Sequence, residues 1–176
     1  LISKPTFKWV FLFLFSMRYH KLSEAQLHEM HEEFAIFLAS QAINKKEWDR
    51  IKEKEPDRIE DFLASFSDLV WEKILSECSY LEFTTPDQAF LFKTGKNKAE
   101  VLVLKIDSNF TDLTSGAGFE KALSQLDSDQ VALFHASKPY TPSRNEFIYE
   151  YLKKGAELSK GDRFNRLQSY FSNSVK

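Results

Sequence analysis

The residues with the clearest potential for chemistry lie in one short stretch, His28–Glu33, which reads His-Glu-Met-His-Glu-Glu. His28 and His31 are three residues apart, and Glu24 and Glu32 each lie four residues from His28, so on a helix these side chains can share one face. Imidazoles together with carboxylates suit zinc or a di-metal carboxylate site. The stretch therefore offers four candidate metal ligands, His28, His31, Glu24 and Glu32.

A solvated helix face is the competing interpretation of the same stretch. A metal site needs further ligands from a second element, and no other predicted helix carries a Glu-x-x-His pair. The spacing also differs from the His-Glu-x-x-His of metalloproteases, because here the two His residues are closer together. We therefore predict a polar, solvent-facing surface without a metal or other cofactor, and keep a metal-binding protein or small enzyme as the alternative.

Basic and aromatic side chains gather towards the C-terminus. Residues 138–176 carry 8 Lys and Arg against 4 Asp and Glu, whereas residues 17–82 carry 9 against 15. Because basic groups contact phosphates and aromatic rings stack on bases, RNA binding is a second alternative. Its candidate residues are Lys153, Lys154, Lys160, Arg163 and Arg166. The net charge of −2 and the absence of an RNA-binding signature weigh against it.

The remaining reactive side chains favour structural roles. Cys78, the only cysteine, ends a predicted helix with no His or acid placed to activate it, which predicts a buried thiol and fits a reducing compartment. Ser115–Gly118 lacks the Lys-Ser/Thr ending of a phosphate-binding P-loop. His135 ends a predicted strand without a serine, cysteine or acid at a recognised spacing. We assign no catalytic and no cofactor-binding residue, and an enzyme is the less favoured class.

The elements that would position these residues are organised around a predicted β-meander. Tyr80–Thr84, Ala89–Lys93 and Glu100–Asp107 are rich in Phe, Leu and Val and are bounded by turn residues, which predicts three antiparallel strands. Val131–His135 predicts a fourth strand. A helix over Phe119–Leu126 precedes it, and such a crossover favours a parallel pairing.

Helices are predicted before and after this sheet in the sequence, and they must cover its apolar face. Capping residues at Ser23, Asn44 and Ser143 begin three of them. Apolar residues at helical spacing predict the first from Ser23 to about Ser40, a long one over 57–77, and a last one over 162–171. We predict a single α+β domain over residues 17–176, in which N-terminal helices pack on a small mixed sheet, a three-stranded antiparallel meander plus one crossover strand, with C-terminal helices.

The first sixteen residues read differently from the rest. Two lysines and the apolar run Trp9–Phe15 resemble a secretory signal, but no cleavage site follows and the run is too short to span a bilayer. The chain begins with Leu1, and we expect Met17 to be the true first residue, with a signal or membrane anchor as the alternative. A chain that starts at Met17 is expected to be cytoplasmic and not attached to a membrane.

Four segments carry a resemblance to a known family. Met17–Leu22, Phe66–Glu72, Tyr80–Glu82 and Lys154–Gly161 resemble a small family of uncharacterised bacterial proteins, a domain of unknown function. The resemblance covers Met17 to the C-terminus and implies no activity and no catalytic residues.

The absence of a catalytic constellation and the division between an acidic N-terminal and a basic C-terminal part favour a non-catalytic protein that binds another protein. The expected contact surface is either the charged face of the helices at 24–55 or an open sheet edge that could accept a strand.

Overall fold

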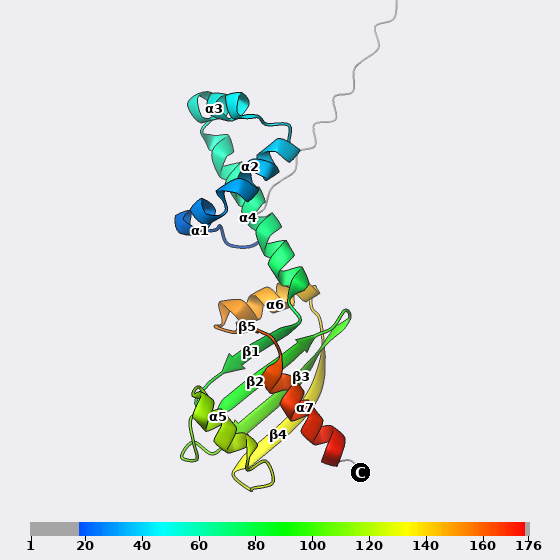
Figure 1. Cartoon of the computed structure of the whole chain (residues 1–176). Helices are drawn as coiled ribbons and strands as arrows, with labels where there is room; N and C mark the ends of the chain where they lie inside the picture. Colours follow the sequence, from blue (N-terminus) through cyan, green and yellow to red (C-terminus); the bar gives the residue numbers. More distant parts are fainter. Residues whose placement is uncertain (1–17, 175–176) are drawn as a thin grey trace, which may run out of the picture. The chain divides into compact units, whose positions relative to one another are not determined.

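The computed structural model describes residues 18–174, which form seven helices and one five-stranded sheet (Figure 1). The predicted α+β class is confirmed. The described residues divide into two compact units, one up to Trp71 and one from Glu72 onwards, and each is described by itself. The predictions for residues 1–16 lie outside the described residues, and the domain boundary at Met17 stays a prediction.

The N-terminal unit contains α1 (Glu24–Glu29), α2 (His31–Ser40), α3 (Lys45–Lys54) and the larger part of α4 (Asp57–Glu77). The capping box at Ser23 is present: its hydroxyl accepts the Gln26 N–H, and the Gln26 side chain accepts the Ser23 N–H. The single helix predicted from Ser23 to Ser40 is wrong, because the chain leaves helical geometry at Met30 and begins again at His31. No Gly or Pro marks this break in the sequence.

Aromatic rings fill the interior of the N-terminal unit. The Phe34 ring lies 5.1 Å from Phe66 and 5.6 Å from Trp48, centroid to centroid, and Trp48 lies 5.8 Å from Phe62. Such edge-on pairs add to the free energy gained by burying the rings. The apolar stripe of α4 thus holds α2 and α3 together.

The segment before α1 is fixed to α4 by backbone hydrogen bonds. The Asp68 carboxylate accepts the N–H groups of Arg18 and Tyr19, each at 3.0 Å. The Ser67 hydroxyl accepts the Leu22 N–H at 3.1 Å, and Trp71 Nε1 donates to the His20 carbonyl at 3.1 Å. Two of the four segments that carry the family resemblance therefore bind each other.

The C-terminal unit is built on the sheet. Its strands are β1 (Tyr80–Thr84), β2 (Gln88–Thr94), β3 (Lys98–Ile106), β4 (Val131–Pro139) and β5 (Glu157–Ser159), in the spatial order β4-β3-β2-β1-β5. All neighbouring strands are antiparallel. The meander of β1, β2 and β3 is as predicted, whereas β5, which pairs with β1, was not predicted.

The parallel pairing predicted for the fourth strand is wrong. β4 runs antiparallel to β3, with Ile106 opposite Val131, so the chain re-enters the sheet at the end where it left. Helix α5 (Gly116–Leu123) has eight residues and is therefore only about 12 Å long. The nine residues of β3 extend about 30 Å, so this helix is too short to carry the chain back to the start of β3.

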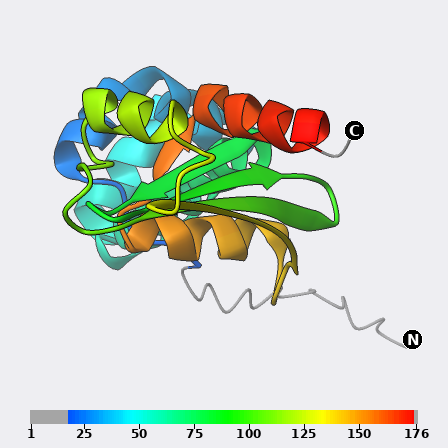
Figure 2. The same cartoon turned by 90° about the horizontal axis from the view of Figure 1, so that it is seen from below.

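Helices cover the two faces of the sheet unequally. Helices α5 and α7 (Asp162–Ser174) lie on one face and α6 (Arg144–Lys153) on the other (Figure 2). The core under α5 and α7 includes Leu91, Leu102 and Leu104. Under α6, the Phe92 ring lies 4.5 Å from that of Tyr151.

Arg144, the first residue of α6, joins the end of α4 to the sheet. Its guanidinium donates to the carbonyl oxygens of Leu75 at 2.8 Å, of Thr94 and Gly95 at 3.3 Å, and also to that of Cys78. The last carbonyls of a helix have no partner within the helix, so Arg144 supplies one to Leu75. The Cys78 carbonyl also accepts the Thr94 hydroxyl, at 2.6 Å. The cation also suits the negative end of the helix dipole.

Candidate functional site

Strand β4 is an outermost strand of the sheet, and no strand within residues 18–174 pairs with its outer side. The Asp107 N–H donates to the Gln130 carbonyl at 3.1 Å, which places a hydrogen-bonded pair just beyond the end of the β3–β4 ladder. Hydrogen-bonded and non-hydrogen-bonded pairs alternate along an antiparallel ladder. The N–H and C=O groups of Leu133, His135 and Ser137 therefore point outwards, away from β3.

Most of β4 lacks the features that usually prevent an edge strand from pairing with another chain. Edge strands are commonly short, bulged or charged. β4 has nine residues in continuous register with β3, and no charged residue occurs between Val131 and Ser137. Only Lys138 and Pro139, at the end of β4, are residues of the types that hinder pairing with a further strand. At the opposite side of the sheet, β5 covers only three residues of β1.

An apolar row crosses the sheet and ends at this open edge. Phe83, Phe90, Val103 and Phe134 pair in succession across β1, β2, β3 and β4. Alternation along β2 puts Phe90 on the same face as Phe92, the face that α6 covers. Phe134, the last member of the row, is 55% exposed. The free edge of β4 thus carries an exposed aromatic side chain beside its unpaired backbone groups.

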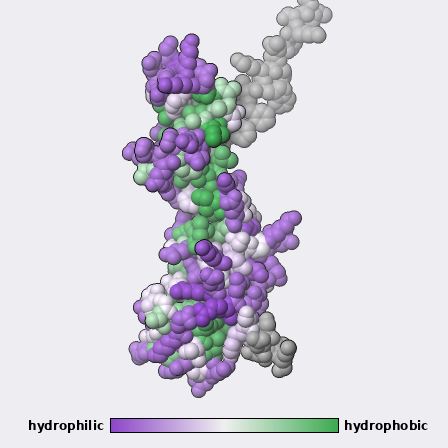
Figure 3. All heavy atoms as spheres, viewed as in Figure 1, coloured by the Kyte–Doolittle hydropathy of each residue, from purple (hydrophilic) through white to green (hydrophobic). Residues whose placement is uncertain are grey.

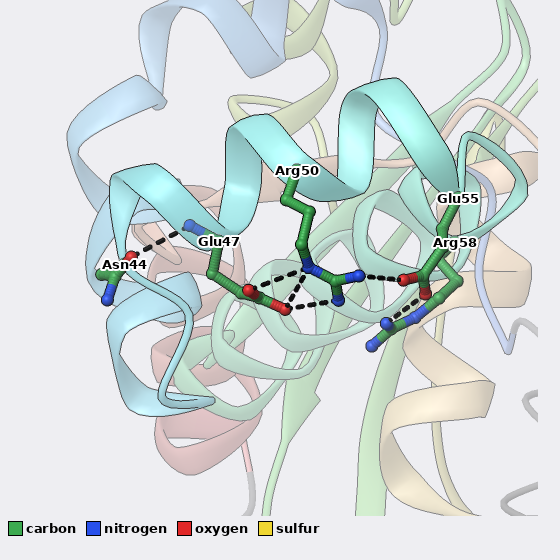
Figure 4. A network of polar contacts seen from close by, with 5 residues as sticks. All are labelled: Asn44, Glu47, Arg50, Glu55 and Arg58. Carbon is green, nitrogen blue, oxygen red and sulfur yellow. Dashed lines mark hydrogen bonds and ion pairs between the residues drawn. The ribbon is translucent and has the colours of Figure 1, made fainter.

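The charged helices offer a less available surface. Hydrophilic residues cover α1 and α3 (Figure 3). On α3, however, Arg50 pairs with Glu47 at 2.7 Å and with Glu55 at 2.9 Å, and Arg58 pairs with Glu55 at 2.6 Å (Figure 4). Hydrogen bonds from Arg50 and Arg58 hold the pKa of Glu47 and Glu55 below the usual value of a glutamate. These four charges of α3 and the start of α4 therefore bind one another.

The candidate metal ligands lie on two short helices. His28 and Glu24 belong to α1, and His31 and Glu32 to the first turn of α2, and all four are exposed. The two imidazole rings stack with centroids 6.2 Å apart, and His31 Nδ1 lies 3.1 Å from the His28 carbonyl oxygen. Residues 18–174 contain no group of three or more His, Cys, Asp or Glu side chains placed to hold a metal ion. Metal binding at His28 and His31 stays a prediction that this geometry does not support.

The candidate RNA-binding residues do not form one basic surface. Lys153, at the end of α6, pairs with Glu150 at 2.6 Å, and Lys154 lies over the Tyr151 ring. On α7, Arg163 pairs with Glu82 at 3.5 Å and Arg166 with Glu120 at 2.5 Å. Lys160 is exposed, just before α7. Because α6 and α7 lie on opposite faces of the sheet (Figure 2), these residues do not share the face that RNA binding would need. RNA binding stays a prediction.

Cys78 and His135 have the surroundings of structural residues. Burial raises the pKa of the Cys78 thiol, which supports its interpretation as unreactive. His135 lies in the middle of β4 rather than at the end of a strand, because β4 continues to Pro139. It is exposed, and its ring lies 5.7 Å from that of Phe171.

A polar pocket of about 250 Å³ was not predicted from the sequence. Its lining residues are Glu82, Thr84, Thr114, Gly155, Glu157 and Arg163. The Glu82 carboxylate accepts the Ser159 hydroxyl and pairs with Arg163. Residues of the Tyr80–Glu82 and Lys154–Gly161 segments meet here through the pairing of β1 with β5, which no local sequence signal indicates.

These observations define an α+β protein whose five-stranded antiparallel sheet ends, on one side, in the long outer strand β4. The model of a family of unknown function, DUF6495, matches residues 17–172, and the chain belongs to this family. The predicted resemblance to a family without an assigned function is thereby confirmed. No curated protein and no solved structure matches the chain. No helix within residues 18–174 has both the length and the apolar character needed to cross a bilayer.

Proposed function

We propose that this protein is a non-catalytic, cytoplasmic adaptor that binds another polypeptide along the free edge of β4. The observation that carries the proposal is the nine-residue outer strand, whose Leu133, His135 and Ser137 each offer an outward N–H and C=O. In strand addition, such main-chain groups supply affinity, and pockets for alternate side chains supply specificity.

The apolar row indicates which side chains the added strand should carry. Every second residue of that strand would lie on the face of α6, beside Phe134 and in line with Val103. Because Phe134 is 55% exposed, an aromatic or β-branched residue opposite it would remove apolar surface from water. The expected ligand is therefore an extended segment with an apolar residue at that position.

The cytoplasmic location rests on the cysteine content. The chain has one cysteine, and it is buried and free. Proteins of oxidising compartments are more often disulfide-bonded, so a lone thiol favours a reducing one. Fractionation of cells that express the native gene would test the location directly.

The test of function compares two substitutions at one position. His135→Pro removes one outward N–H and leaves the β3 ladder intact, because edge strands accept proline where the N–H faces solvent. His135→Ala removes the imidazole and keeps the N–H. We expect a partner captured from native extract by the wild-type protein to be retained by His135→Ala and reduced about tenfold or more by His135→Pro.

Circular dichroism of both variants shows whether the fold is kept. Equal capture by the two variants would contradict strand addition at β4. Metal analysis of the same purified protein examines the alternative: stoichiometric zinc or iron, with no captured partner, would support the site at His28 and His31 instead.

A further inference from the structure

The free edge of β4 is chemically complementary to itself. Asp127 and Asp129 precede the strand, Lys138 lies near its end, and no charge occurs between Val131 and Ser137. The Asp127 carboxylate accepts the Tyr170 hydroxyl of α7, and Lys138 donates to the Tyr151 hydroxyl of α6 at 3.1 Å, so each charge is bound to a neutral group. Two such strands side by side in antiparallel orientation would bring the acidic start of each next to the basic end of the other.

We propose that the polypeptide bound at β4 is the β4 strand of a second copy of this chain, so that two sheets join into one of ten strands around a two-fold axis. The inference rests on the proposed function, because it needs β4 as an accepting edge, and it adds the identity of the occupant. A two-fold interface places the same surface of both subunits in contact, which the charge pattern of β4 suits. A parallel arrangement would instead bring like charges together.

The alternation of backbone groups limits the register. Because Leu133, His135 and Ser137 point outwards, the hydrogen-bonded pairs between subunits must join odd-numbered residues to one another. Pairing Leu133 with the partner's His135 places Phe134 opposite the partner's Phe134. Lys138 then lies opposite the partner's Gln130, and the partner's Asp129 follows one position further along the edge. The two side chains point to opposite faces of the sheet, so their charges attract across the edge without forming a direct ion pair.

This register also completes the apolar row. Directly opposed residues of a non-hydrogen-bonded pair have Cα atoms only about 4.5 Å apart, so their side chains are close neighbours. The 55% exposed Phe134 ring would meet its own counterpart and lose much of its contact with water. The row Phe83, Phe90, Val103 and Phe134 would continue without interruption into the second subunit.

The first test measures the mass of the full chain in solution by sedimentation equilibrium over a range of concentrations. Because one strand pair is a small interface, we expect a concentration-dependent dimer in the wild-type protein and in His135→Ala, and at least about a tenfold weaker association in His135→Pro. A wild-type chain that stays monomeric at every concentration would overturn the proposal, as would a His135→Pro variant that dimerises like wild type.

The second test examines the register by disulfide trapping with a thiol oxidant. In Phe134→Cys the two introduced thiols would lie within disulfide range across the axis, because Cα separations of about 4.4–6.8 Å permit the bond. In Ala132→Cys, which lies on the same exposed face of β4, the two thiols would be about 13 Å apart. Fast cross-linking of the first and slow cross-linking of the second is the expected result, and equal rates would overturn the register.

The two proposals fail in different ways. If the wild-type protein is monomeric but captures another protein in a manner that His135→Pro abolishes, strand addition stands and the second copy is excluded as its occupant. If His135→Pro changes neither capture nor mass, both proposals are wrong.

Discussion

Replacement of Arg144 tests whether this side chain holds the C-terminal unit together. Arg144→Ala leaves the carbonyl groups of Leu75, Cys78 and Thr94 without the donor that they share. These groups belong to three different parts of the unit: the last turn of α4, the two-residue link between α4 and β1, and the end of β2. The substitution should therefore lower the free energy of unfolding without removing any part of the apolar core.

The expected magnitude follows from the geometry of the individual bonds. The contacts to Leu75 and Cys78 are the shortest, and hydrogen bonds to a charged donor contribute about 1.5–3 kcal/mol each. The contacts at 3.3 Å to Thr94 and Gly95 are longer and add little. The site is partly open, so water can replace some bonds, and the Thr94 hydroxyl still donates to the Cys78 carbonyl. We therefore take the lower limit for the two short contacts, about 3 kcal/mol at most in total for Arg144→Ala. Arg144→Lys keeps the charge but has no planar fork, so it should lose about half of that.

Urea unfolding followed by far-UV circular dichroism measures this loss, from the shift in midpoint at constant slope. Arg166→Ala is the matched control, since it removes an arginine of the same unit from an exposed ion pair with Glu120. The control should unfold close to wild type. If Arg144→Ala behaved like Arg166→Ala, or if Arg144→Lys were as stable as wild type, the assignment of Arg144 as a shared donor would be wrong.

Three further predictions concern single positions. Gly161 has φ +84, and an added Cβ would lie 2.6 Å from the Tyr80 ring. Gly161→Ala should therefore lower the free energy of unfolding, measured in urea, by about 2–4 kcal/mol. Gly116→Ala is the control, because its Cβ would meet nothing within 4 Å, and it should leave this free energy unchanged. Cys78, whose pKa burial raises, should resist iodoacetamide in the native protein and react once urea unfolds it. Arg50 lowers the pKa of Glu47, and Arg58 together with Arg50 lowers that of Glu55, so the stabilising contribution of these glutamates is present above the ordinary glutamate pKa of 4.5 and is lost as pH falls through the lowered values. Arg50→Ala should therefore flatten the acid side of the pH dependence of the urea midpoint, and an unchanged profile would contradict this.

Elements with a long or alternating apolar pattern were predictable from the sequence. The boundaries of α4 agree with prediction because its apolar stripe continues over 21 residues. The three meander strands agree to within two residues, since turn residues bound each of them. The cap residues Ser23, Asn44 and Ser143 also bind the N–H groups expected of them.

Features set by distant contacts were not predictable. The three residues of β5 are too few to show the alternation of apolar and polar residues that predicts a strand. They form a strand only because they pair with the edge of β1. The second half of β4 is exposed and polar, so no apolar pattern indicates that the strand continues past His135. An open edge was among the predicted contact surfaces, but which strand forms it depends on the sheet order, and the antiparallel return of β4 decides that order.

The position of β5 and α7 at the end of the chain has a consequence for synthesis of the protein. Ser159 hydrogen-bonds to Glu82, 77 residues earlier in the chain. During synthesis, the outer edge of β1 therefore stays unpaired until the last part of the chain has left the ribosome. Until then, the sheet also lacks Phe164 and Leu167, which belong to the core on one of its faces. A chain terminated before Glu157 would therefore expose two strand edges and an apolar face at once. Premature termination should yield a substrate for chaperones and proteases rather than a partly active fragment.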